Sequence, residues 1–109
     1  MPERSEREAA YFALLRARDE LSDLQRYAEH LEDELRRLRR SEREEAALRT
    51  NVSGRVRRVL RASDAELIEV MQRRASLVED ERMRLPSRIE AAQAFVAECE
   101  HHHDVLGGT

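Results

Sequence analysis

Near residue 100 the sequence carries two pairs of side chains that could bind a metal ion. Cys99 and His103 are four residues apart, as are Glu98 and His102. At this spacing two side chains lie on one face of a helix, where a thiolate and an imidazole can bind Zn²⁺. A stable site needs at least three converging ligands, and the sequence offers no second ligand cluster. We therefore expect no metal site and no other cofactor.

A strongly basic segment in the middle of the chain is the second candidate for a binding site. Residues 36–61 hold 10 arginines and 3 carboxylates, a net charge of +7, while the segments on either side are acidic. Phosphate groups or an acidic partner could bind to Arg55, Arg57, Arg58 and Arg61. A solvated helix face also explains such arginines, and no aromatic residue lies among them to stack on bases. Nucleic-acid or nucleotide binding is therefore an alternative function.

No arrangement of residues typical of an enzyme is present. The sequence lacks a glycine-rich phosphate loop, a nucleophile elbow and a paired cysteine motif. Carboxylates are abundant, but they fall on faces expected to be exposed, with arginines nearby that can pair with them. We expect no catalytic residue and no enzymatic activity.

The elements that position these residues follow from the spacing of the apolar side chains. From Leu14 to Leu38, leucine and alanine recur in alternating steps of three and four residues, which is the spacing of a coiled-coil seam. The next two seam positions are Glu42 and Glu45, so the apolar stripe ends before the helix does. The pattern predicts a helix over about residues 5–49.

A second seam with the same spacing runs from Ile68 to Leu106. The string Ser63-Asp64-Ala65-Glu66 has the form of a capping box, which predicts a helix over about residues 64–106 and a basic tip at residues 50–62. Inside a helix, proline costs about 3 kcal/mol, so Pro86 predicts a kink or a break. The seam keeps its phase across this residue, which favours the kink.

Two long helices with a short connection fold back most simply as a hairpin. With charged residues at 39%, the chain is too polar for a large globular core. We therefore predict an all-α fold, an antiparallel coiled-coil helical hairpin, as a single domain over residues 1–109. In this register Leu14 faces Cys99, and Leu24 faces Ile89.

Apolar side chains outside the seams predict a further packing partner. They project where the opposite helix of a hairpin cannot cover them. We expect a three- or four-helix bundle with a second chain, which is either another protein or a second copy of this one. The side chains expected to bind that partner are Tyr11, Phe12, Leu15, Leu67, Val70, Leu77 and Phe95.

Short strings in both predicted helices resemble the helix ends of one protein family. They are Asp19-Glu20-Leu21-Ser22, Asp33-Glu34-Leu35 and Ser63-Asp64-Ala65-Glu66-Leu67. In these strings and in its hairpin organisation the sequence is similar to the RsiG-like anti-sigma factors of actinobacteria, small antiparallel helical hairpins that hold a flagellar-type sigma factor. The resemblance implies a transcription regulator of anti-sigma type, with a sigma factor as its partner.

That family binds cyclic di-GMP through a helical signature of Glu, Ser, Arg, Gln and Asp at fixed spacing. Aligned on Ser22, this chain matches the signature only at Ser22 and Asp33. Aligned on Arg82, it matches only at that arginine. The sequence therefore does not predict a cyclic di-GMP site.

Composition also bears on the cellular location. The single cysteine excludes an intrachain disulfide, the first residues lack the apolar core of a signal peptide, and no apolar run approaches the roughly 18 residues that span a bilayer. All 20 basic side chains are arginines, a bias typical of GC-rich bacterial genomes. We expect a cytoplasmic bacterial protein that does not contact a membrane.

Overall fold

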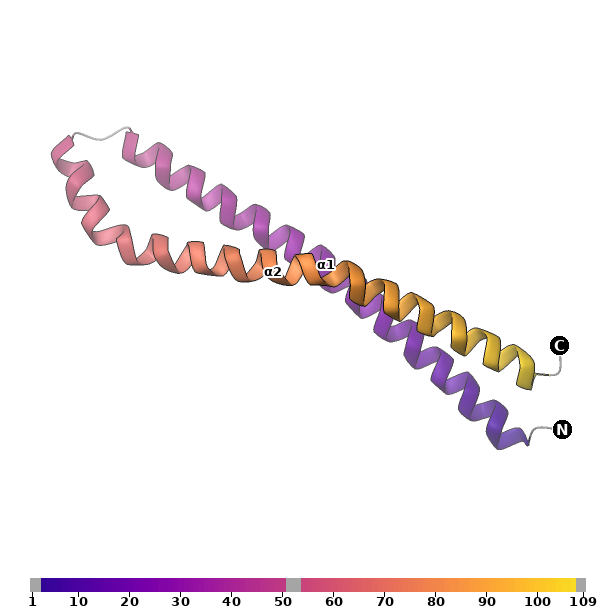
Figure 1. The fold of residues 1–109 in the computed structure, drawn as a ribbon. Coiled ribbons are helices and arrows are strands. Elements are labelled where there is room, and N and C mark those ends of the chain that lie inside the picture. Colours follow the sequence, from indigo (N-terminus) through magenta and orange to yellow (C-terminus); the bar gives the residue numbers. More distant parts are fainter. Residues whose placement is uncertain (1–2, 51–53, 108–109) are drawn as a thin grey trace. The chain divides into compact units, whose positions relative to one another are not determined.

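Two long helices make up the computed structural model of the chain, which describes residues 3–50 and 54–107 (Figure 1). Helix α1 is Arg4–Thr50 and helix α2 is Gly54–Leu106. The side chains of residues 49, 50, 57 and 60–64 lie outside the described part. Among the described residues there is no strand, and the two helices run antiparallel. The predicted all-α class and helical hairpin are confirmed.

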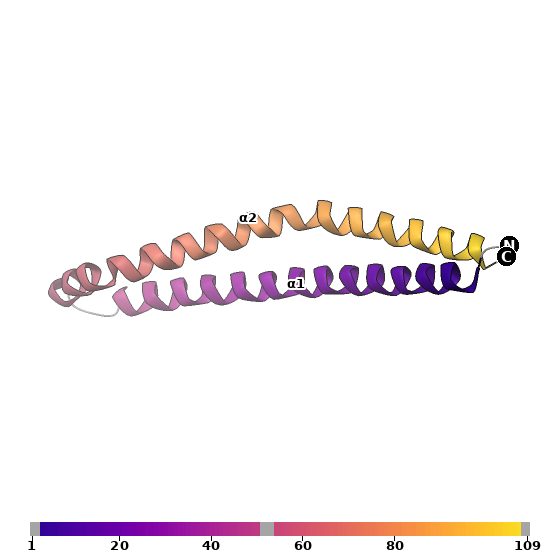
Figure 2. The same cartoon turned by 90° about the horizontal axis from the view of Figure 1, so that it is seen from below.

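Contacts between the helices divide the chain into two compact units. The terminal unit consists of Met1–Glu29 and Arg84–Thr109, and the central unit is His30–Met83. In each unit a stretch of α1 packs antiparallel against a stretch of α2 (Figure 2). Both units are thus built from the same two helices, and the assignment of residues 1–109 to a single domain stays a prediction.

Helix α1 forms because its sequence contains no residue that breaks a helix. Its 47 residues include neither glycine nor proline, and they are rich in alanine, leucine, arginine and glutamate, the best helix formers. At its start the backbone N–H groups of Glu6 and Arg7 donate to the carbonyl oxygen of Glu3, at 3.1 and 3.2 Å. The bond from Arg7 is the first regular bond of the helix, and the bond from Glu6 satisfies one of the donors that a helix N-terminus leaves without an intrahelical partner.

The predicted start of the second helix is wrong. Helix α2 begins at Gly54, so residues 54–62 form its first turns and are not a separate basic tip. The capping box at Ser63 is not used as a helix start, because a helix entering from Gly54 already supplies backbone carbonyls to the amides of that turn. Arginine, valine and leucine dominate residues 55–61, and all three are compatible with a helix.

Helix α2 is continuous through Pro86, which confirms the favoured prediction of an unbroken helix and excludes the alternative of a break. Proline removes one backbone hydrogen bond and crowds the preceding turn, so other contacts must hold the helix together there. The adjacent Leu85 is the most deeply buried large side chain described, with 2% of its surface exposed. Its burial against α1 offsets the local cost of the proline.

The seam predicted from the sequence is the interface between the helices. Its apolar positions from Leu14 to Leu38 and from Ile68 to Leu106 are all buried or half-buried. In the terminal unit Leu14, Ala17 and Val96 form a buried cluster, with Leu21 and Cys99 packed against it. The predicted register, in which Leu14 faces Cys99, is therefore confirmed.

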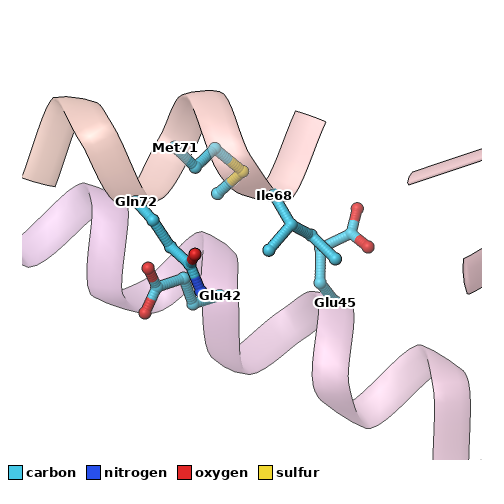
Figure 3. Close-up of a pocket in the computed structure, with 5 residues that line it drawn as sticks. All are labelled: Glu42, Glu45, Ile68, Met71 and Gln72. Atoms are coloured by element: carbon cyan, nitrogen blue, oxygen red, sulfur yellow. The ribbon is translucent and has the colours of Figure 1, made fainter. Parts of the chain in front are cut away.

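In the central unit the apolar seam stops where the sequence predicts. Leu31, Leu35 and Val78 are buried, whereas at the next seam positions Glu42 is exposed and Glu45 is half-buried. A carboxylate cannot fill an apolar layer, and a hollow of about 190 Å³ lies between these glutamates and the α2 residues Ile68, Met71 and Gln72 (Figure 3). The helix continues here without a tightly packed seam.

Leu85→Ala tests the dependence of the fold on this seam. We expect it to lower the free energy of unfolding by about 2 to 5 kcal/mol, because it removes a large side chain from a packed interface. Leu77→Ala is the matched control, since the same truncation falls on the exposed side of the same helix and should cost no more than about 0.5 kcal/mol. Chemical denaturation followed by circular dichroism measures both, and equal losses would contradict the assignment of Leu85 to the core.

Candidate functional site

Most of the predicted partner-binding residues of the terminal unit are exposed. Tyr11, Phe12 and Phe95 have 46%, 58% and 51% of their surface exposed. The prediction for Leu15 is wrong in part, because this side chain is half-buried. A long side chain in a helix lies back over the preceding turn, and here that turn carries two aromatic residues. Leu15 therefore contributes less to the exposed surface than the sequence predicts.

The two aromatic residues of α1 are held in place by ring contacts. Tyr11 packs edge-on against Phe12, with ring centroids 5.8 Å apart, and its ring also lies 5.8 Å from that of His103 on α2. The contact with His103 explains how a polar residue occupies a seam position, since its ring packs across the interface. Phe12 has no such cover and remains the most exposed aromatic side chain described.

Phe95 lies beside a hollow between the two helices of the terminal unit. Its volume is about 210 Å³, and it is lined by Ala10 and Ala13 of α1 and by Phe95, Glu98, Cys99 and His102 of α2. The hollow exists because the alanine side chains of α1 are too short to fill the space next to the phenylalanine ring. The sequence indicated His102 only as a possible metal ligand and did not single out Ala13, although small residues beside an apolar seam were a usable signal.

The residues considered for metal binding do not converge. Cys99, Glu98 and His102 line the hollow, whereas His103 packs against Tyr11. In the part of the chain that the structure describes, no group of three or more histidine, cysteine or carboxylate residues is placed to hold a metal ion. The hollow is thus a mainly apolar surface with polar groups at its rim.

A second exposed apolar face belongs to the central unit. Leu67, Val70 and Leu77 all lie on α2, and each is at least half exposed. Their positions do not coincide with the seam, whose residues Ile68, Met71 and Val78 face α1. Helix α2 thus presents apolar side chains outside its contact with α1, as predicted.

Of the four arginines considered for phosphate binding, the structure describes the side chains of two. Arg55 and Arg58 are exposed in the first turns of α2. Arg57 and Arg61 lie outside the described side chains.

Ion pairs flank the seam of the central unit. A guanidinium nitrogen of Arg74 lies 2.6 Å from Oε1 of Glu34, across the two helices. Arg82, a polar residue at a seam position, donates to Glu32 across the interface and to Glu79 on its own helix. Glu79 also lies 3.7 Å from Arg39 of α1. Because Arg82 extends from the seam to carboxylates at its edge, its charge is not left unpaired in the interface.

These pairs shift the ionisation of their members. The hydrogen bond from Arg74 lowers the pKa of Glu34, aided by the positive charges of Arg74, His30 and Arg37 and opposed by partial burial. Only 17% of the Glu34 side chain is exposed. The hydrogen bond to Glu32, together with the charges of Glu32 and Glu79, raises the pKa of Arg82.

Three comparisons with known proteins give no match for this chain, whether it is compared with protein-family models, with curated proteins or with solved structures. Within the described residues, no helix is both long enough and apolar enough to cross a membrane. Any proposal of function therefore rests on the exposed apolar and charged surfaces of the two units.

Glu34→Gln removes the charge of a carboxylate beside the seam. It should therefore lower the free energy of unfolding at neutral pH. A carboxylate whose pKa is lowered by folding adds stability above its unfolded pKa, and this stability is lost as the pH falls through the lowered value. The difference between wild type and variant should therefore be smaller at about pH 3 than at neutral pH, because pH 3 lies below the ordinary glutamate pKa of about 4.3 and closer to the lowered pKa of Glu34. Urea denaturation of wild type and variant at neutral pH and at about pH 3 measures this difference. The exposed Glu66→Gln is the control, and a pH-independent difference would argue against the Arg74 pairing.

Proposed function

We propose that this chain is a non-enzymatic helical-hairpin protein that binds another protein through exposed helix faces. The observation that supports it most is Phe95, half of whose surface is exposed at the edge of a 210 Å³ hollow. A partner that covers an exposed aromatic side chain and the apolar hollow beside it removes apolar surface from water, which stabilises the complex. Packing of a partner helix into this hollow is the mode of binding that fits this surface.

The residues around the hollow support a helix as the binding element. On the α1 wall Ala10 is buried and Ala13 is half-buried, and the short side chain of Ala13 lets a second backbone approach α1 closely there. Phe95 forms the other wall, while Glu98 and His102 supply polar groups at the rim. An apolar centre with a polar rim is the usual organisation of a protein–protein interface.

The finer proposal is a transcription regulator of anti-sigma type. It rests on the resemblance of the strings at Asp19 to Ser22 and at Ser63 to Leu67 to the RsiG-like family. On this proposal a helix of a sigma factor packs against the terminal unit and is sequestered.

Self-assembly into a structural coiled coil and binding of nucleic acid through the basic segment are alternative functions. The pull-down described below distinguishes them from the anti-sigma proposal.

Phe95→Ala is expected to weaken partner binding at least fivefold, about 1 kcal/mol or more, because the ring is the largest side chain at the hollow. It should leave the free energy of unfolding within about 0.5 kcal/mol of the wild type, since the ring is exposed in the free protein. Val105→Ala, an exposed apolar residue of the same helix and unit, is the matched control. Pull-down from an extract of the source cell followed by mass spectrometry identifies what is retained.

Each outcome of the pull-down selects one function. A protein retained by wild type and Val105→Ala but lost with Phe95→Ala supports binding at the hollow, and a sigma factor among such proteins supports the anti-sigma proposal. Retention of the chain itself alone indicates a self-assembling coiled coil. Retention of nucleic acid alone, with no protein lost on Phe95→Ala, would contradict the proposal.

A further inference from the structure

Two segments of α1 carry exposed side chains that complement each other in charge. In the terminal unit, Arg16, Glu20 and Asp23 are exposed, and in the central unit, Arg37, Arg40 and Glu44 are exposed. Five of these six form no ion pair with another described residue, and Asp23 only approaches Arg26 at 4.0 Å. Elsewhere on α1 charged side chains do pair, as Asp33 does with Arg36 at 2.9 Å. Apart from Arg37, whose charge also acts on Glu34, the charges of the two segments are therefore available to a partner.

Each segment also contains one highly exposed apolar side chain. Phe12 has 58% of its surface exposed, and Leu48 has 64% exposed. Phe12 stands four residues before Arg16, and Leu48 stands four residues after Glu44. Because steps of three and four residues keep side chains on one helix face, each segment presents its charges and its apolar residue on the same side.

The two segments have the same spacing when one of them is reversed. From Phe12 the steps to Arg16, Glu20 and Asp23 are four, four and three residues. From Leu48 backwards, the steps to Glu44, Arg40 and Arg37 are also four, four and three residues. An antiparallel pairing thus places Phe12 against Leu48, Arg16 against Glu44, Glu20 against Arg40 and Asp23 against Arg37. Each of these three charged positions then faces an opposite charge.

A parallel pairing of the same segments has the opposite effect. It places Arg16 close to Arg40 and Glu20 close to Glu44, so that like charges meet at two positions. Like charges facing each other in an interface are costly, whereas complementary charges fix which surfaces meet and in which orientation. The pattern therefore selects the antiparallel arrangement.

We propose that a second copy of this chain docks on α1, with residues 12–23 of one copy packed antiparallel against residues 37–48 of the other. Exposed ion pairs each contribute little, so the charges determine register and orientation while Phe12 and Leu48 add apolar contact. Added salt should weaken the association, since it screens exposed charges. The hollow beside Phe95 is not part of this interface and stays available to another protein.

A charge-swap experiment tests the proposal. One variant carries Arg37→Glu and Arg40→Glu, and a second carries Glu20→Arg and Asp23→Arg. Each variant alone should self-associate at least about tenfold more weakly than the wild type, because like charges then face each other. An equimolar mixture of the two should associate again, since the reversed segment of one complements the reversed segment of the other. Sedimentation equilibrium at micromolar concentration measures the association, and circular dichroism verifies helicity.

The matched control for the first variant is Arg55→Glu with Arg58→Glu, which makes the same change in net charge at exposed positions of α2. It should associate like the wild type. A monomeric wild type, variants that associate as well as the wild type, a mixture that does not recover, or an equal loss in the control would each overturn the proposal. Phe95→Ala should leave self-association unchanged, so that a failure of this interface is distinguishable from a failure of the proposed binding of another protein.

Discussion

Packing of α1 against α2 along a narrow apolar seam is the interaction on which the rest of the structure depends. A helix gains little stability from its own hydrogen bonds in water, and burial of one stripe of side chains supplies the rest. In the terminal unit this stripe centres on Leu14, Ala17 and Val96, and in the central unit on Leu31, Leu35 and Val78. Every other feature of the molecule is arranged around these contacts.

Charged residues at the edge of the seam are held by this packing and add specificity to it. Arg82 occupies a seam position, and its guanidinium pairs with Glu32 of the opposite helix. A register that moved the guanidinium away from any carboxylate would leave its charge unpaired in the interface, which is costly. A polar residue at one seam position is a known means of fixing register in coiled coils. Arg82 thus helps to select one register of an interface in which apolar side chains alone would allow others.

A two-helix interface also explains why so much apolar surface stays exposed. Each helix can bury only the face turned toward its partner, so side chains on other faces remain in water unless a further chain covers them. Tyr11, Phe12 and Phe95 of the terminal unit and Leu67, Val70 and Leu77 of the central unit are of this kind. The proposed binding of another protein at Phe95 and of a second copy along α1 would cover different parts of this surface.

The two long helices and the positions of their apolar seam could be predicted from the sequence, and the choice of a hairpin then set which ends of the helices meet. The regular spacing of leucine and alanine is a property of each helix alone, so it could be recognised without knowing which residues lie opposite. Only the tertiary structure decided that α2 begins at Gly54, that Arg82 pairs with Glu32, and that Ala13 and Phe95 border a hollow. The ion pair and the hollow depend on which side chains the opposite helix brings near, whereas the start at Gly54 reflects residues 55–61, whose side chains are compatible with a helix even though the sequence pattern predicts a tip there. Local periodicity carries no such information, because a hollow is defined by the lengths of side chains that are far apart in the sequence.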